Sequence, residues 1–181
     1  MNIALIGFMG VGKTTVSRVL SRQLGMPEVD VDRRIARQEG RSIPEIFETD
    51  GEDAFRDLET AVIRELCEAG RELAGGQILS CGGGAVLRSE NVAELKKDGV
   101  IVLLTARPET VLSRVGDGSS RPALGGKVTT EHIAELMEKR RTVYEAAADM
   151  TVSTDGRSPE EIAEEIRKRA ESFFTRPPKY V

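Results

Sequence analysis

Residues 3–15 read Ile-Ala-Leu-Ile-Gly-Phe-Met-Gly-Val-Gly-Lys-Thr-Thr, an apolar stretch that runs directly into a glycine-rich segment. Gly7, Gly12, Lys13 and Thr14 have the spacing G-x-x-x-x-G-K-S/T, which is typical of a phosphate-binding loop between a strand and a helix. Glycines let consecutive backbone N–H groups turn toward phosphate oxygens without an obstructing side chain. The alternative is an ordinary glycine-rich turn, but the strand pattern before the motif and the helix pattern after it favour phosphate binding.

The side chains of this motif predict its chemistry. Lys13 is expected to reach the β- and γ-phosphates of a nucleotide, and the Thr14 hydroxyl is offered to Mg²⁺. The helix that follows ends at Gly25, and its positive N-terminal end faces the same anion.

Length and charge narrow the class of protein. The chain has 181 residues, 39% of them hydrophobic, and a net charge of −4 from 26 basic and 30 acidic residues. This size suits one domain with one core, and the charge disfavours a bulk nucleic-acid partner, although a local basic cleft stays open. Met1 is followed at once by the first strand, and no apolar run approaches a membrane span. We therefore expect a soluble, cytoplasmic protein.

Cysteine and histidine usage limits the catalytic options. Cys67 and Cys81 lack metal-ligand spacing, so we interpret both as free thiols in a reducing compartment. His132 is the only histidine, which excludes a metal site built from several histidines.

Strand and helix patterns alternate along the rest of the chain. Short strands are expected at 26–32, 77–81, 100–104 and 149–154, with helices between them. This alternation predicts an α/β fold with a doubly wound parallel sheet.

The region 33–70 has a helical pattern that is broken at Gly40, at Pro44 and at Gly51. Ser42 is the expected cap of the second helical segment, just as Ser89 and Ser158 are expected to cap later helices. Because this region is longer than a simple crossover requires, it suggests a small subdomain over the edge of the sheet.

Asp30 and Asp32 are two residues apart, so on a strand they would project from the same face. One carboxylate could face the water shell of a metal and the other a substrate hydroxyl. A charged strand end or a helix cap is the alternative. Neither apolar strand, 77–81 nor 100–105, ends in an aspartate that could hold Mg²⁺, which leaves Asp30 as the available metal-side carboxylate.

Three arginines stand out by their position. Arg56 lies three residues before Glu59 on one helix, where the pair could hold the guanidinium for an external anion or form a solvated surface ion pair. Arg140 falls inside an apolar helical stripe, so it must line a cleft or pair internally, and we favour the cleft. Arg121 lies in the polar loop 116–126, which has the length of a mobile lid; an incidental arginine on a surface loop is the alternative.

The triplet Gly82-Gly83-Gly84 follows the strand expected at 77–81. Ligands of parallel α/β sheets lie beyond the carboxyl ends of the strands, where glycines let the backbone touch a ligand. A flexible turn is the alternative reading of the triplet.

Several motifs in this order make the chain similar to the shikimate kinases over nearly all of its length. They are GFMGVGKTT at 7–15, VDVD at 29–32, GRSIPEIFETDGEDAFRDLE at 40–59, GGG at 82–84, SRPAL at 120–124 and EKRRTVY at 138–144. The resemblance implies phosphorylation of the 3-hydroxyl of shikimate by MgATP, on the route to chorismate and the aromatic amino acids. It also implies a P-loop fold like that of the nucleoside monophosphate kinases. Ala123 departs from the leucine common after the lid's Arg-Pro, which puts the packing of the lid in doubt.

The resemblance also implies a division of one domain, 1–181, and a role for each matching residue. The core would comprise 1–31, 71–114 and 127–175, with substrate-binding helices at 32–62 and a lid at 115–126. Catalysis would depend on Lys13, Asp32 and Arg121. ATP would be bound by Gly10, Val11, Gly12, Lys13, Thr14, Thr15, Arg114, Arg121 and Arg157. Shikimate would be bound by Asp32, Phe47, Phe55, Arg56, Gly82, Gly83 and Arg140. Mg²⁺ would be held by Thr14 and, through water, by Asp30.

Two alternatives come from different classes. A gluconate kinase of the same fold would share the phosphate loop but not the two carboxylate-binding arginines. A nucleotide-dependent regulatory module would have no acceptor substrate. We expect the small molecules ATP and shikimate as partners, no nucleic acid or membrane, and a monomer.

Overall fold

The computed structural model describes residues 1–115 and 129–174. Its sheet contains five parallel strands in the order β2-β3-β1-β4-β5. The strands are β1 (Asn2–Ile6), β2 (Glu28–Asp30), β3 (Ile78–Ser80), β4 (Gly99–Thr105) and β5 (Met150–Ser153). The predicted doubly wound parallel sheet is confirmed, and the expected strands lie within one or two residues of these bounds at most of their ends.

The central strand β1 explains why the first apolar stretch decides the fold. It pairs with β3 on one side, where Ile3 is opposite Ile78, and with β4 on the other, where Ile3 is opposite Val100. Ile3 and Leu5 belong to one buried cluster, whereas Ala4 and Ile6 belong to another on the opposite face. A strand covered on both faces has to be apolar throughout, as residues 3–6 are.

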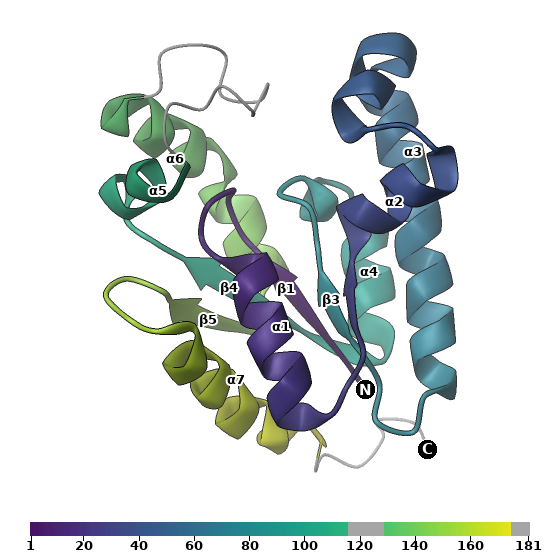
Figure 1. Ribbon diagram of the computed structural model, residues 1–181, viewed down its shortest axis with the longest axis vertical. Coiled ribbons are helices and arrows are strands. Elements are labelled where there is room, and N and C mark those ends of the chain that lie inside the picture. Colours follow the sequence, from purple (N-terminus) through teal and green to yellow (C-terminus); the bar gives the residue numbers. More distant parts are fainter. Residues whose placement is uncertain (116–128, 175–181) are drawn as a thin grey trace.

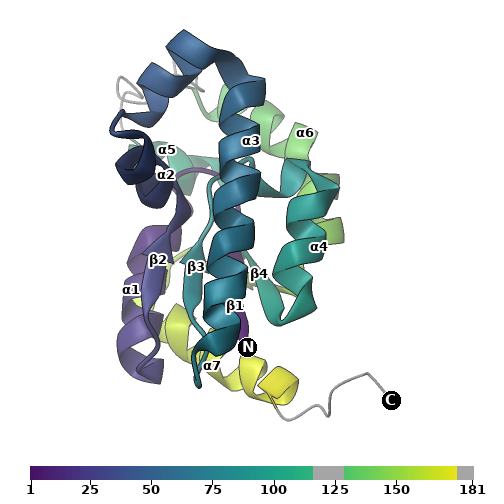
Figure 2. The ribbon, with the colours of Figure 1, turned by 90° about the vertical axis from the view of Figure 1, so that its right-hand side faces the viewer.

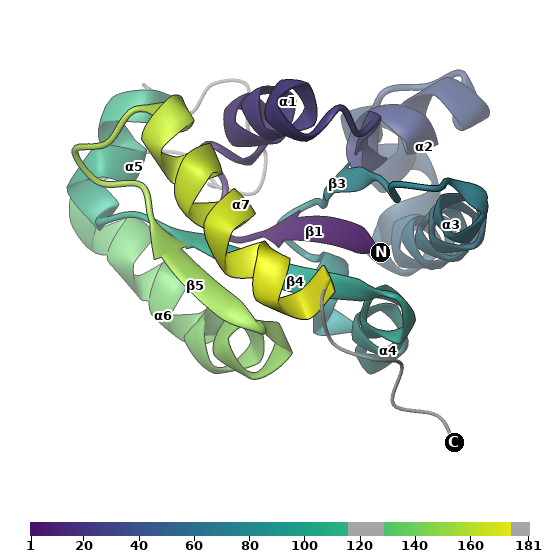
Figure 3. The same ribbon diagram turned by 90° about the horizontal axis from the view of Figure 1, so that it is seen from below.

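Seven α-helices and one short 3₁₀ helix cover the sheet within the described part of the chain. They are α1 (Lys13–Leu24), α2 (Val31–Glu39), α3 (Ile43–Glu72), η1 (Ala85–Leu87), α4 (Ser89–Lys97), α5 (Pro108–Val115), α6 (Thr130–Ala147) and α7 (Pro159–Phe174). Helices α1 and α7 pack together on one face of the sheet, and α3, α4 and α6 cover the other (Figures 1 and 3). None of these helices is long and apolar enough to cross a membrane.

The helical region after β2 rises above the carboxyl ends of the strands. Gly40 ends α2 in the left-handed conformation, and α3 is kinked at Gly51, where φ is 87°. Pro44 lies in the first turn of α3, where its missing N–H costs nothing. Figure 2 shows the long second part of α3 beside the sheet and its first part beyond it, next to α2.

Two of the three expected serine caps are confirmed. Ser42 accepts from the Glu45 N–H, and the Glu45 carboxylate accepts from the Ser42 N–H at 2.7 Å, a reciprocal capping box. Ser158 and Glu161 make the same pair of bonds at the start of α7. The prediction for Ser89 is wrong: Arg88 is the extended residue before α4, and Ser89 is already its first helical residue.

We expect Ser42→Ala to lower the free energy of unfolding by about 1 kcal/mol, because one N–H of the first turn of α3 loses its acceptor. Ser89→Ala is the matched control, and it should change stability by less than about 0.5 kcal/mol. Denaturant unfolding followed by circular dichroism measures both. Equal losses in the two variants would contradict this account of the caps.

Candidate active site

The phosphate loop has the backbone that its glycines predicted. Gly7, Gly10 and Gly12 all have positive φ angles, of 137°, 76° and 102°. At Gly7 a Cβ atom would also lie 2.4 Å from the carbonyl oxygen of Leu104, so the loop crosses the end of β4 too closely for any side chain. Lys13 Nζ curls back over the loop and donates to the carbonyl oxygens of Gly7 at 2.8 Å and Phe8 at 3.0 Å.

Asp30 and Asp32 lie near the phosphate loop, one at the end of a strand and the other at the start of a helix. The expectation that they share one face of a strand is wrong: Asp30 ends β2 and caps α2, and Asp32 lies in the first turn of that helix. The Asp30 side chain accepts from the Arg33 N–H and, through its other oxygen, from the Thr14 hydroxyl at 3.2 Å. The cap suggested as the alternative is therefore present, at Asp30, and it leaves one carboxylate oxygen beside Thr14.

Both carboxylates nevertheless line one cavity of about 330 Å³ at the carboxyl ends of the strands. Its lining combines phosphate-loop residues, both aspartates and the start of the glycine triplet: Met9, Gly10, Gly12, Lys13, Thr14, Asp30, Asp32, Ser80, Cys81, Gly82, Gly83 and Arg114. An ammonium group, two carboxylates and bare backbone thus face the same small space.

Asp32 is held in an unusual electrostatic environment. Its Oδ1 atom is buried and has no hydrogen-bond partner among the described residues. Burial, and then the nearby Asp30, raise the pKa of Asp32, while Lys13 and Arg56 act in the opposite direction. A buried acceptor without a donor is costly, which marks Oδ1 as an atom that is suited to a ligand hydroxyl.

The pair of Arg56 and Glu59 is internal rather than solvated. Arg56 donates to Glu59 at 2.8 Å, and the exposed fractions of the two side chains are 12% and 0%. Arg56 also donates to Glu52 at 3.0 Å. Burial raises the pKa of Glu59, whose Oε1 atom has no partner in the described part of the chain. The predicted pairing is confirmed, and the surface alternative is wrong.

The aromatic pair predicted to wall a ligand lies next to Arg56. The ring centroids of Phe47 and Phe55 are 4.6 Å apart, and the Arg56 guanidinium carbon lies 5.2 Å from the centre of the Phe55 ring. Phe55 is buried, whereas Phe47 is exposed. An apolar surface thus adjoins the guanidinium.

The glycine triplet connects these groups. A Cβ atom at Gly82 would lie 2.6 Å from Asp32 Oδ1 and 3.1 Å from Glu59 Oε1, and one at Gly84 would lie 2.3 Å from the Arg56 guanidinium. None of the three glycines has a positive φ angle, so a flexible turn does not explain them. At Gly82 and Gly84 charged side chains approach the backbone too closely for a Cβ atom, whereas at Gly83 a Cβ atom would make only ordinary contacts of 3.6 Å or more.

Arg140 joins the triplet from α6, donating to the Gly83 carbonyl oxygen at 3.3 Å. Tyr144, one turn later, donates to the same oxygen. The two arginines therefore converge on Gly83 and Gly84, and the cavity begins at Gly82 and Gly83. Sequence reasoning did not select Tyr144 for the site, although it follows Arg140 by one helical turn.

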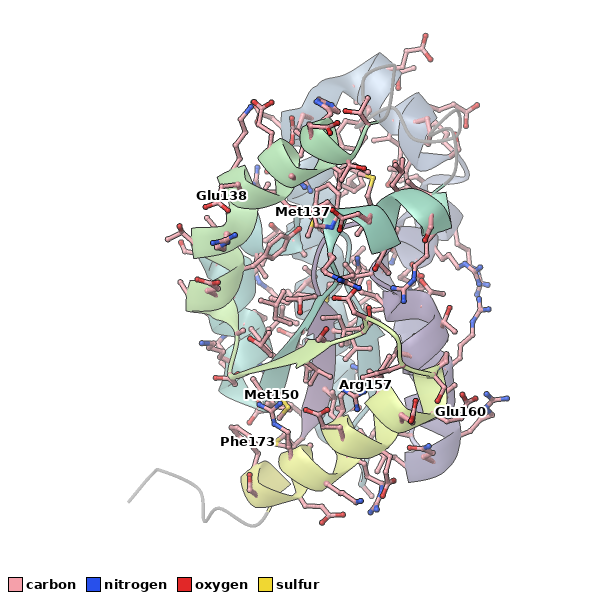
Figure 4. The ribbon with its side chains drawn as sticks, turned by 90° about the vertical axis from the view of Figure 1, so that its left-hand side faces the viewer. Met137, Glu138, Met150, Arg157, Glu160 and Phe173 are labelled. Carbon is pink, nitrogen blue, oxygen red and sulfur yellow. The ribbon has the colours of Figure 1, made fainter. Side chains whose placement is uncertain are left out.

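Most of the remaining predicted residues lie away from the glycine triplet or outside the described part of the chain. Val11 and Thr15 belong to the phosphate loop and the first turn of α1, and Thr15 is exposed. Arg157 is paired with Glu165 at 2.6 Å and lies between β5 and α7 (Figure 4). Arg121 and the rest of the expected lid beyond Val115 lie outside the described residues. Cys67 and Cys81 are both buried free thiols, and burial raises the pKa of Cys67 to about 11.

A second cavity of about 430 Å³ lies behind the phosphate loop, between β4 and α6. Its lining is mainly apolar and includes Phe8, Leu104, Met137 and Tyr144; Figure 4 shows Met137 on α6. We place the reaction in the smaller cavity, because that one contains Lys13, Asp30 and Asp32.

A phosphate loop, a buried carboxylate and two arginines meet at the carboxyl ends of the strands of one parallel sheet. This combination defines a P-loop kinase that acts on a small acidic molecule. The comparisons with known proteins agree. The family model described as shikimate kinase matches residues 9–171. The chain belongs to the shikimate kinase family.

Individual relatives resemble the chain over nearly its whole length. The shikimate kinase of Thermodesulfovibrio yellowstonii is 44% identical over 170 residues, which cover 94% of this chain and 95% of that protein. A structure of Acinetobacter baumannii shikimate kinase in complex with shikimate has a TM-score of 0.86 at 34% identity, covering 97% of this chain and 95% of that one. A gluconokinase from Sinorhizobium meliloti shares only the fold, at 18% identity and a TM-score of 0.57, with 96% and 95% covered.

We expect Asp32→Asn to separate activity from stability. Because the pKa of Asp32 is raised in the folded state, stability is lost as the pH rises from the unfolded-state value through the raised pKa, so the neutral variant should be at least as stable at pH 7. Its kcat should fall by about 10²-fold or more. Turnover and denaturant unfolding measure the two effects, with the exposed Asp53→Asn as control. A variant that is both active and less stable would contradict the assignment.

Proposed function

We propose that this shikimate kinase transfers the γ-phosphoryl group of ATP to the 3-hydroxyl of shikimate, giving ADP and shikimate 3-phosphate. The observation that carries the proposal is the convergence of Asp32, Arg56 and Arg140 on one glycine triplet beside the phosphate loop. Two guanidinium groups suit a carboxylate, and a buried acceptor suits a hydroxyl. A ring acid that carries hydroxyl groups supplies both the carboxylate and the hydroxyl. The reaction serves chorismate and aromatic amino acid biosynthesis.

The acceptor would be held at three points. Arg56 and Arg140 clamp its carboxylate, with the backbone of Gly82 and Gly83 beside it. Phe47 and Phe55 wall the ring. Asp32 Oδ1 accepts a hydrogen bond from the attacking hydroxyl.

The nucleotide would lie on the other side of the cavity. The backbone of Gly10, Val11 and Gly12 binds the phosphates, together with Thr15 at the start of α1. Lys13 moves from the loop carbonyls onto the β- and γ-phosphates. Arg121 would meet the transferred group from the lid, and Arg114 and Arg157 would flank the adenine.

The phosphoryl transfer forms one bond to phosphorus and breaks one. A bond forms between the substrate oxygen and the γ-phosphorus, and the bond from that phosphorus to the β,γ-bridging oxygen breaks. The hydroxyl proton passes to Asp32, whose raised pKa suits it to receive that proton. The rest of the catalysis is positioning and stabilisation of charge, which explains why no cysteine or histidine is needed.

Mg²⁺ would fit beside Thr14 and Asp30. The Thr14 hydroxyl and one Asp30 carboxylate oxygen lie 3.2 Å apart, and both are the hard oxygen donors that this ion prefers. The described residues contain no group of three acidic, histidine or cysteine side chains that could hold a metal alone, which suits an ion that arrives with the nucleotide phosphates. When bound, the ion neutralises charge on those phosphates.

We expect Asp30→Asn to raise the Mg²⁺ concentration needed for half-maximal activity. Asparagine caps a helix about as well as aspartate, so α2 should remain intact. A titration of activity with Mg²⁺ at fixed ATP measures the shift, and unchanged circular dichroism provides the control. An unchanged Mg²⁺ requirement would remove Asp30 from the metal site.

We expect Arg140→Ala to raise the KM for shikimate by about tenfold or more, while the KM for ATP changes little. Arg141→Ala is the matched control, because that exposed neighbour is paired with Glu138. The methyl ester of shikimate sharpens the test: without a carboxylate to clamp, it should lose little from Arg140→Ala. An equal loss of ATP affinity, or an equal loss with the ester, would contradict the clamp.

The function is tested by the release of ADP, coupled to an indicator reaction, with shikimate or gluconate as acceptor. We expect release with shikimate only. Release with gluconate would support the sugar-acid kinase of the same fold. ATP binding without release in either case would support a regulatory module.

A further inference from the structure

Arg114, near the end of α5, makes contacts that binding to adenine does not require. Its Nη1 atom donates to the carbonyl oxygens of Val11 at 3.2 Å and Gly10 at 3.4 Å. The same atom donates to the Thr154 hydroxyl at 2.9 Å, and Nη2 donates to the Thr154 carbonyl oxygen at 3.1 Å. One guanidinium therefore joins the phosphate loop to the segment that follows β5.

The far end of this connection is fixed. Thr154 is 1% exposed. Its N–H donates to the Thr105 carbonyl oxygen at 2.8 Å, and its hydroxyl donates to the same oxygen at 3.1 Å. Thr105 ends β4, so Arg114 is anchored to the sheet through Thr154.

At the phosphate loop, Arg114 controls the direction of two peptide groups. In a trans peptide, the carbonyl of one residue and the N–H of the next point in opposite directions. A guanidinium that holds the carbonyls of Gly10 and Val11 therefore turns the N–H groups of Val11 and Gly12 away from itself. These glycine-rich peptide planes rotate easily without such a contact.

We propose that Arg114 and Thr154 form a brace that sets the direction of the phosphate-loop amides, which makes Arg114 a positioning residue for the triphosphate. This role is separate from any contact with adenine, and it rests on the proposed binding of ATP in the phosphate loop. A lysine at this position would keep the charge but not the fork, because it cannot reach both the loop carbonyls and the two Thr154 oxygens.

The test compares ATP with inorganic tripolyphosphate, which has the phosphates but no base, by isothermal titration calorimetry. We expect Arg114→Lys to weaken both ligands by about tenfold, because hydrogen bonds to a charged group are lost. The KM for shikimate at saturating ATP should not change. Arg169→Lys is the matched control, since Arg169 holds the carbonyl of Thr151 on the edge strand, away from the site.

The Thr154 variants test the anchor without altering the charge. Thr154→Val should weaken tripolyphosphate binding by about threefold or more, whereas Thr154→Ser keeps the hydroxyl and should restore it. The proposal is overturned if Arg114→Lys weakens ATP but leaves tripolyphosphate binding unchanged, which would make Arg114 an adenine contact only. A wild-type protein that binds ATP but not tripolyphosphate would also overturn it. A wild-type protein that binds neither would instead refute the proposed function.

Discussion

The close approach of charged side chains to the backbone of residues 82–84 is the constraint on which the site depends. Asp32 comes from the first turn of α2, Arg56 from α3 and Arg140 from α6. Asp32 lies where a Cβ atom of Gly82 would be, Arg56 where a Cβ atom of Gly84 would be, and Arg140 donates to the carbonyl oxygen of Gly83. Side chains from three helices that are far apart in sequence can therefore meet at this segment, because its glycines leave room for them. The parallel sheet contributes by placing β3, and the triplet that follows it, directly beside β1 and the phosphate loop.

The same approach carries an electrostatic cost. Asp32 and Glu59 have raised pKa values, and each has one oxygen without a hydrogen-bond partner among the described residues, close to where a Cβ atom of Gly82 would lie. Arg56 offsets part of the cost of burying both carboxylates, and Lys13 offsets part of the cost for Asp32. In the proposed function, a substrate hydroxyl would satisfy the Asp32 oxygen better than the protein does, and this would make binding energy available for positioning. The ion pair of Arg56 and Glu59 also fixes the guanidinium before any ligand arrives.

Much of this could be predicted from sequence, because the signals were local. The spacing of the phosphate loop, the apolar strands and the capping boxes each depend on residues a few positions apart. The apolar stripe predicted that Arg140 points inward toward a cleft, and Arg140 does donate to the carbonyl oxygen of Gly83, which lines the cavity. What failed depended on the position of a boundary: a two-residue shift in the start of the helix decides whether Asp30 or Asp32 is its cap. Tyr144 was missed because its partner is a backbone carbonyl, which leaves no sequence pattern, whereas the spacing of Arg56 and Glu59 did predict their pair.

A crystal structure of the enzyme with shikimate and a non-hydrolysable ATP analogue tests the central claim most directly. The account predicts that the ring carboxylate contacts both Arg56 and Arg140, that Asp32 Oδ1 accepts from the hydroxyl nearest the γ-phosphate, and that Lys13 has left the carbonyls of Gly7 and Phe8. A carboxylate bound away from the two arginines, with Asp32 Oδ1 still without a donor, would contradict it.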